Sequence, residues 1–241
     1  MIHPLERPMT FPLDRPNHVV ICPDGTRRYA IKQGLTIEEA YKVSAQRLLE
    51  VIQWLIDEHA IPNVTVYLTH PSTHITRPQG QLQALYRVFA DFLAQCNIFC
   101  SEFDIQLQAV GELELLPISL YTNLKHLQAA TIHHHNLLTL LIGYSARREI
   151  LSAADQCPPG ASFADFASFL WVQLPVHLIL RTGGVPQIGD MLLLQSIEAR
   201  LFFINKLFPE LTRQDIDWVL AEFAKCNRCG GEDLERRRTL Q

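Results

Sequence analysis

Short apolar runs alternate along this chain with longer stretches of helical periodicity. The strand-like runs lie near residues 18–22, 63–69, 104–110, 136–143, 175–180 and 201–204. Between them, apolar side chains recur every three or four residues, as in 36–59, where Thr36 and Glu39 have the spacing of a helix-capping box. This alternation is typical of βαβ units, so the sequence predicts an α/β fold with a mostly parallel sheet flanked by helices.

The length and composition are those of one globular domain. A chain of 241 residues, 48% apolar and 19% charged, can bury a large core. We expect residues 1–16 to be an irregular, proline-rich leader, 17–231 to be a single domain and 232–241 to be a charged tail.

Several classes of protein are disfavoured by composition. The formal net charge of −4 gives no reason to expect a nucleic-acid partner. No run of about eighteen apolar residues predicts a transmembrane helix, and the N-terminus lacks the apolar core of a signal peptide. The six cysteines are too sparse for a disulfide framework. We therefore expect a cytoplasmic protein with reduced thiols.

The first predicted strand runs into a Pro-Asp-Gly turn that carries one acid and two arginines. Asp24 is the acid, and Arg27 and Arg28 are the arginines. A carboxylate can hold Mg²⁺, and guanidinium groups can bind phosphate oxygens in pairs. Taken alone, however, this turn is better explained as a solvated charge cluster on the surface.

Two other strand exits also carry arginine. Arg77 follows the second strand within a polar loop at 70–78, and Arg181 ends the fifth, followed by Thr182 and two glycines. The carboxyl ends of parallel strands meet at one edge of a sheet, where α/β proteins bind their ligands. The convergence favours a phosphorylated ligand over a surface turn. Neither a P-loop nor a dinucleotide-binding fingerprint is present.

Other candidate sites are weaker. The run at 133–135 is three adjacent histidines, which point in different directions and make a poor chelating set. Cys226 and Cys229 have the spacing of a zinc site but no second ligand pair nearby. Cys96 and Cys100 are typical of buried thiols.

With these residues located, the sequence from about 18 to 231 resembles the cis-prenyltransferase family, which includes undecaprenyl diphosphate synthase. Several motifs in the family's order carry the resemblance. They are Asp24-Gly25-x-x-Arg28, Arg77-Pro78, Gly143-Tyr144 leading to Arg147, Arg181-Thr182-Gly183-Gly184 and Arg228-Cys229-Gly230.

The resemblance implies a six-stranded, mostly parallel sheet, a hydrophobic tunnel enclosed by helices, and a homodimer. It implies that Asp24 holds Mg²⁺ on an allylic diphosphate, such as dimethylallyl, geranyl or a longer prenyl diphosphate. Gly25, Arg28 and Arg77 would bind that diphosphate, and Arg181 and Thr182 would line a second diphosphate site. Arg228 and Gly230 would reach that second site from the partner subunit.

The chain departs from the family pattern around the first motif. Typical members read Asp-Gly-Asn-Gly-Arg-Trp-Ala, whereas this chain has Thr26-Arg27 for Asn-Gly and Tyr29 for Trp. The Gly-His pair that follows becomes Ala40-Tyr41, and the Asn-Trp pair before Arg-Pro becomes His74-Ile75. Arg27 is thus an additional candidate for diphosphate binding.

The second diphosphate site departs further. The Arg-x-Ser after Arg-Thr-Gly-Gly becomes Gln187-Ile188-Gly189, and a metal-binding Glu of the family becomes Arg200. We expect Arg200 to supply a positive charge where the family recruits Mg²⁺. Ordinary elongation with isopentenyl diphosphate is therefore doubtful, and the first motif looks closer to the branch that makes cyclolavandulyl diphosphate.

These features favour an enzyme that ionises a short allylic diphosphate and captures the cation by an irregular, branching or cyclising route. His74 or the released diphosphate would take the final proton. Regular short-chain cis-elongation is one alternative, and a non-catalytic partner subunit is another. Tunnel shape, and hence the product, would depend on the helices near 79–98 and 114–131.

Overall fold

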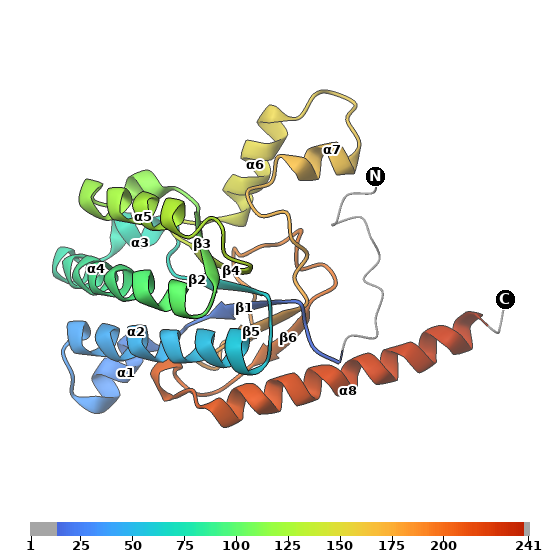
Figure 1. Ribbon diagram of the computed structural model, residues 1–241, viewed down its shortest axis with the longest axis horizontal. Coiled ribbons are helices and arrows are strands. Elements are labelled where there is room, and N and C mark those ends of the chain that lie inside the picture. The colour runs from blue at the N-terminus through green and yellow to red at the C-terminus, as the bar shows by residue number, and fades with distance from the viewer. Residues whose placement is uncertain (1–13, 239–241) are drawn as a thin grey trace.

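Six parallel strands form one sheet at the centre of the protein (Figure 1). The computed structural model describes residues 14–238, and over 227–238 it describes only the course of the helix. The strand order is β3-β4-β2-β1-β5-β6. The strands are β1 (His18–Cys22), β2 (Asn63–Tyr67), β3 (Ile105–Val110), β4 (Asn136–Leu141), β5 (Leu178–Arg181) and β6 (Arg200–Phe203). The predicted α/β sheet is confirmed, and all of its strand pairs are parallel.

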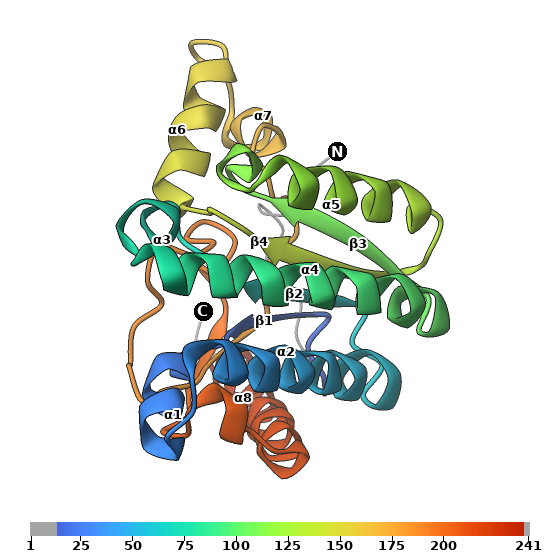
Figure 2. The same cartoon turned by 90° about the vertical axis from the view of Figure 1, so that its left-hand side faces the viewer.

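Helices cover both faces of the sheet unequally. They are α1 (Thr26–Gln33), α2 (Ile37–Gln53), α3 (Pro71–Thr76), α4 (Gln79–Glu102), α5 (Ile118–Ala130), α6 (Ala146–Gln156), α7 (Phe163–Ser168) and α8 (Arg213–Arg238), with short turns of helix at η2 (Trp54–Glu58), η3 (Leu113–Leu115) and η4 (Phe208–Glu210). Figure 2 looks onto the face where α5, α4 and α2 lie side by side, with α1 at one end of α2.

The side chains of β1 show how each face is buried. Val19 and Ile21 belong to the larger core cluster, which includes side chains of α2, α4, α5 and α8. Val20 and Cys22 point to the opposite face and join a smaller cluster with Tyr144 and residues near 172–192. Alternation of side chains along a strand produces this division, and burial on both faces explains the uninterrupted apolar run.

Local sequence signals account for several helix boundaries. The capping box that begins α2 is present, because the Thr36 amide donates to Glu39 Oε2 at 2.8 Å and the Glu39 amide donates to Thr36 Oγ1 at 3.3 Å. The strand predicted to be half exposed, β3, is at the edge of the sheet. Within residues 14–238, none of the helices combines the length and hydropathy needed to cross a bilayer.

Some predicted elements differ from the structure. The loop predicted at 70–78 contains α3, because Pro71 suits the first position of a helix and the His70 ring accepts the Ser72 amide at 3.1 Å. The helix predicted at 162–172 is only α7. The backbone of α8 continues to Arg238, into the predicted tail, and most of the predicted leader lies outside the described residues.

A buried histidine in β1 predicts how stability depends on pH. His18 is 2% exposed, its Nδ1 lies 3.0 Å from the Pro175 carbonyl oxygen, and its Nε2 lies 2.8 Å from Thr65 Oγ1. Burial is the main cause that lowers the pKa of His18 to about 4, and the nearby His177 lowers it further.

Because this pKa is depressed in the folded state, the stability due to neutral His18 is complete above about pH 6.5 and is lost as the pH falls towards 4. We expect the free energy of unfolding to fall by about 3 kcal/mol over that range from this group. Urea unfolding of the wild type and His18→Gln at intervals from pH 4 to 7.5 measures the difference. If the free energy of unfolding changed with pH by the same amount in the two proteins, the prediction would be wrong.

Candidate active site

A cavity of about 870 Å³ lies between α1, α2 and α4, beside the carboxyl end of β1. Its apolar wall includes Leu48 of α2, Leu85, Phe89 and Phe92 of α4, and Phe208 of η4. Helical spacing explains why one stripe of each helix faces the same space. None of the described lining residues comes from α5, the helix predicted near 114–131, which packs against α4 and β3.

The polar end of the cavity is centred on Asp24. Arg28 Nη2 lies 3.3 Å from Asp24 Oδ1, and Arg181 Nη2 lies 2.9 Å from Asp24 Oδ2. The two arginines come from α1 and from the end of β5, so neighbouring parallel strands bring them to one carboxylate. The convergence of Asp24, Arg28 and Arg181 matches the sequence expectation that arginines at strand exits share one site.

Backbone contacts position this ion-pair cluster. Thr182 is fully buried; its hydroxyl donates to the Asp24 carbonyl at 2.9 Å and accepts the Asp24 amide at 3.0 Å. Arg28 Nη1 donates to the Gly183 carbonyl at 2.8 Å. Thr182 therefore links the turns that follow β1 and β5.

Gly25 begins α1 in a left-handed conformation, with φ 109°, and supplies no side-chain cap. A Cβ there would lie 2.8 Å from Leu207 Cδ2. The N-terminus of α1 thus lies at the polar end of the cavity, and no side chain caps the amides of its first turn. Unsatisfied amides and the positive end of a helix dipole favour an anion.

Arg27 and Arg77 also line the cavity. Arg77 Nη1 donates to the Tyr41 hydroxyl at 2.9 Å, and its Cζ lies 5.9 Å from the Tyr41 ring centroid. Burial lowers the pKa of Arg77, and the nearby charge of Arg27 lowers it further. Like charges held close together in a partly buried site are stabilised by an anionic ligand.

The carboxylate oxygens of Asp24 are compatible with Mg²⁺ that is bound together with a phosphorylated ligand. Within residues 14–226, whose side chains are described, no cluster of three or more His, Cys, Asp or Glu side chains could form a metal cage. Mg²⁺ commonly binds through one or two carboxylates, several waters and substrate phosphates. Asp24 is 32% exposed and faces the cavity, so it fits that mode.

His74 does not line the cavity. Its Nε2 lies 2.8 Å from Thr69 Oγ1 and its Nδ1 lies 2.9 Å from the Tyr86 hydroxyl, and the two rings are stacked. Burial lowers the pKa of His74, and Arg77 adds to this effect. The Tyr86 hydroxyl donates to the Leu115 carbonyl. This network suits a neutral imidazole that joins the segment after β2 to α4.

Arg200 is not placed with the other arginines within this chain. The register pairs Arg200 with Leu178, whereas Arg181 pairs with Phe203. Arg200 is thus at the amino end of β6 and the Asp24 cluster is at the carboxyl end of β1 and β5. For Arg228, Cys229 and Gly230 the structure describes only the backbone course of α8, so their part in the site stays a prediction.

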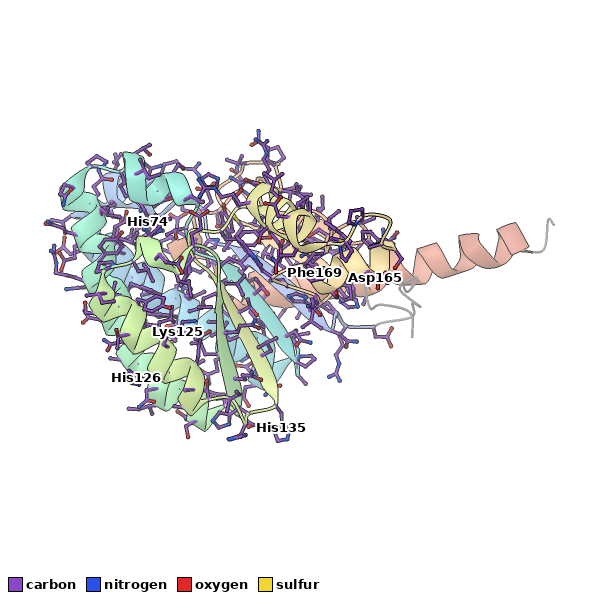
Figure 3. The ribbon with its side chains drawn as sticks, turned by 90° about the horizontal axis from the view of Figure 1, so that it is seen from above. His74, Lys125, His126, His135, Asp165 and Phe169 are labelled. Carbon is purple, nitrogen blue, oxygen red and sulfur yellow. The ribbon has the colours of Figure 1, made fainter. Side chains whose placement is uncertain are left out.

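The histidine run lies at the opposite end of the sheet from His74 (Figure 3). His134 Nδ1 and His135 Nδ1 lie 2.8 and 2.6 Å from the two oxygens of Asp104. The contacts join the end of α4 to the start of β4. They account for these residues without a metal.

Two groups near the arginines were not singled out by sequence reasoning. The Gln187 carbonyl accepts from Arg181 Nη1 at 2.7 Å, a main-chain contact for which the side chain gives no signal. Asp190 accepts from the Ser145 hydroxyl at 2.5 Å and from the Arg147 amide at 3.1 Å. It thereby anchors the loop after β5 to the start of α6. The only signal in the sequence for this role is that Asp190 is a polar residue within an apolar stretch.

Comparisons with known proteins agree with this fold. A family profile described as "Putative undecaprenyl diphosphate synthase" matches residues 22–231. The tritrans,polycis-undecaprenyl-diphosphate synthase (geranylgeranyl-diphosphate specific) of Pyrobaculum aerophilum is 27% identical, with 88% of this chain and 94% of the relative covered. The isoprenyl transferase of Rickettsia typhi is also 27% identical, with 89% and 97% covered.

Two solved structures share the fold. Lavandulyl diphosphate synthase from Lavandula x intermedia, in complex with dimethylallyl diphosphate, is similar with a TM-score of 0.82, 23% identity and coverage of 88% and 96%. A probable undecaprenyl diphosphate synthase from Campylobacter jejuni has a TM-score of 0.72 with the same identity and coverage. With the family profile spanning most of its length, the chain belongs to the undecaprenyl diphosphate synthase-like family of cis-prenyltransferases.

Proposed function

We propose that this protein ionises a short allylic diphosphate in an Mg²⁺-dependent reaction and captures the cation by irregular condensation or by cyclisation. Its family membership makes it a prenyltransferase that acts on isoprenoid diphosphates. The finer reaction rests on one observation: a strongly cationic cluster closes one end of an apolar cavity.

The charges at that end suit a diphosphate. Arg28 and Arg181 pair with the carboxylate of Asp24, and Arg27 and Arg77 line the same cavity, so four guanidinium groups and one carboxylate leave a surplus of three positive charges. Arg181 is largely buried, and its Nε has no partner among the described residues. A multiply charged anion would satisfy these guanidinium groups, and paired N–H donors match phosphate oxygens well.

The cavity suits ionisation of an allylic C–O bond. Arg28 and Arg77 would neutralise the oxygen that departs with the bonding electrons, and the wall at Leu48, Phe89 and Phe92 would keep water from the cation. Bound at Asp24, Mg²⁺ would supply further charge to the diphosphate oxygens. A double bond of a second prenyl unit, or of the same chain, then forms the new C–C bond, and a proton leaves. Both nitrogens of His74 are hydrogen-bonded, which favours the released diphosphate as the acceptor.

The second diphosphate site supports the irregular route. Regular elongation needs a well-formed site for isopentenyl diphosphate, yet Gln187 offers Arg181 only its main-chain carbonyl, and Arg200 lies at the other end of β6. The solved structure with dimethylallyl diphosphate indicates which substrate to test first, although its similarity concerns the fold.

Of the two alternatives, one has specific support. Regular cis-elongation is the activity named for the undecaprenyl-diphosphate synthase relatives. A partner subunit without activity of its own is disfavoured, because Asp24 and both of its arginines are in place. A homodimer, completed by Arg228 and Gly230 of each chain, forms part of the proposal.

The decisive measurement supplies dimethylallyl diphosphate and Mg²⁺ without isopentenyl diphosphate. We expect diphosphate release at a rate well above a control without protein, and branched or cyclised products by mass spectrometry. A strict requirement for isopentenyl diphosphate, with linear products, would support elongation instead. No release from any donor of five to twenty carbons would leave only the partner-subunit alternative.

A further inference from the structure

Tyr41 occupies a fixed position in the cavity wall. It lies on α2, is 8% exposed, and packs with Ala84 and Val88 of α4. Its side chain is among those that line the cavity close to the arginines. Because the ring is held by two helices, its hydroxyl oxygen is held in place relative to the cavity's polar end.

The hydroxyl of Tyr41 is the hydrogen-bond acceptor that the structure gives to Arg77. Arg77 Nη1 donates to it at 2.9 Å. Among the described residues, no carboxylate forms an ion pair with Arg77, although burial and the charge of Arg27 both lower its pKa. A partly buried guanidinium held by a neutral oxygen keeps its charge and most of its donors available for an anion.

The hydrogen of the Tyr41 hydroxyl has no acceptor among the described residues. Burial raises the pKa of Tyr41, with Arg77 and Arg27 opposing the shift, so the phenol is protonated at neutral pH. One oxygen can therefore accept from Arg77 and donate to a ligand at the same time. The two functions of a neutral histidine are on separate ring nitrogens that point apart, so a histidine cannot combine them at one atom.

We propose that Tyr41 is a diphosphate-binding residue that both positions Arg77 and donates its own hydroxyl hydrogen to a phosphate oxygen of the allylic substrate. Tyr41 comes from α2 and Arg77 from the segment between α3 and α4, and together they would bind one diphosphate. The inference rests on the proposed function for the identity of the ligand. It assigns a binding role to Tyr41, which replaces a histidine of the family pattern.

Binding measurements test this role apart from catalysis. Calorimetric titration would use inorganic pyrophosphate and the non-ionising thiolodiphosphate analogue of dimethylallyl diphosphate, both with Mg²⁺. We expect Tyr41→Phe to weaken binding of both probes by about tenfold, the loss of one hydrogen bond to a charged group. Tyr121→Phe is the matched control, because its ring lies beside Lys125 on α5, outside the cavity. It should bind both probes as the wild type does.

A positioning role also predicts coupling with Arg77. In an Arg77→Ala background, Tyr41→Phe should weaken binding by a smaller factor than in the wild type, and in turnover assays Tyr41→Phe should raise KM more than it lowers kcat. Equal factors in both backgrounds, or unchanged affinity in Tyr41→Phe, would overturn the inference. Should Tyr41→Phe fail to fold, Tyr41→His, which keeps a polar ring, is expected to weaken binding in the same direction.

The outcomes separate this inference from the proposed reaction. If the wild type binds pyrophosphate but turns over no prenyl diphosphate, the proposed reaction fails, and the affinity ratio still decides the role of Tyr41. If the wild type turns over dimethylallyl diphosphate and Tyr41→Phe has the same affinity and KM, only the inference about Tyr41 fails.

Discussion

Replacement of Asp24 by Asn is expected to lower the rate of diphosphate release by about a thousandfold. The carboxylate contacts Arg28 through one oxygen and Arg181 through the other, so its loss leaves two guanidinium groups without their shared counter-charge. It also removes the oxygen donor that suits Mg²⁺. The rate is measured with saturating dimethylallyl diphosphate over a range of Mg²⁺ concentrations.

The matched control is Asp91→Asn, which makes the same change of charge on an exposed residue of α4. It should leave the rate unchanged. The fold of Asp24→Asn should survive, because the contacts of the Asp24 backbone with Thr182 do not depend on its side chain. Circular dichroism checks this point. Undiminished release by a folded Asp24→Asn protein would contradict the role of Asp24 in both the irregular and the regular enzymatic routes.

The sheet was predictable because its signals are local. A strand buried on both faces needs an apolar run, and β1 and β4 show it. The capping residues of α2 are three positions apart in the sequence, so the start of that helix could be predicted. The helix α3 was missed because its six residues are too few to show a periodic apolar pattern.

The candidate site was predictable in part for a topological reason. Asp24, Arg28 and Arg181 follow β1 and β5, and neighbouring parallel strands bring their carboxyl ends together. The distance of Arg200 from this cluster within the chain could not be predicted, because a sequence motif does not show at which end of a strand a residue lies relative to its neighbours. The register of β5 with β6 supplies that information. The hydroxyl of Tyr41 as the acceptor for Arg77 depends on how α2 packs against α4, and no local pattern shows that contact.

The second large effect is expected from a single methyl group at Gly183. This glycine has φ 86°, and a Cβ there would lie 2.5 Å from Arg28 Nη2 and 3.2 Å from Asp24 Cβ. The Arg28 side chain is the more flexible of the two neighbours, so it must move, and the hydrogen bond from its Nη1 to the Gly183 carbonyl is disturbed. Misplacement of a binding group by about 1 Å can cost about a hundredfold, so we expect kcat/KM of Gly183→Ala to fall by about that factor.

Backbone strain alone cannot explain such a loss if the control behaves as expected. Gly160, in the turn between α6 and α7, has φ 80° and no atom within 4 Å of an added Cβ. Gly160→Ala therefore carries the same conformational cost of about 1–2 kcal/mol without a clash. Both variants should lose thermal stability from the backbone cost, and only Gly183→Ala should lose kcat/KM. The added methyl group of Gly183→Ala displaces the Arg28 side chain. Equal kcat/KM in the two variants would therefore show that the position of Arg28 beside Asp24 and Gly183 does not matter for turnover.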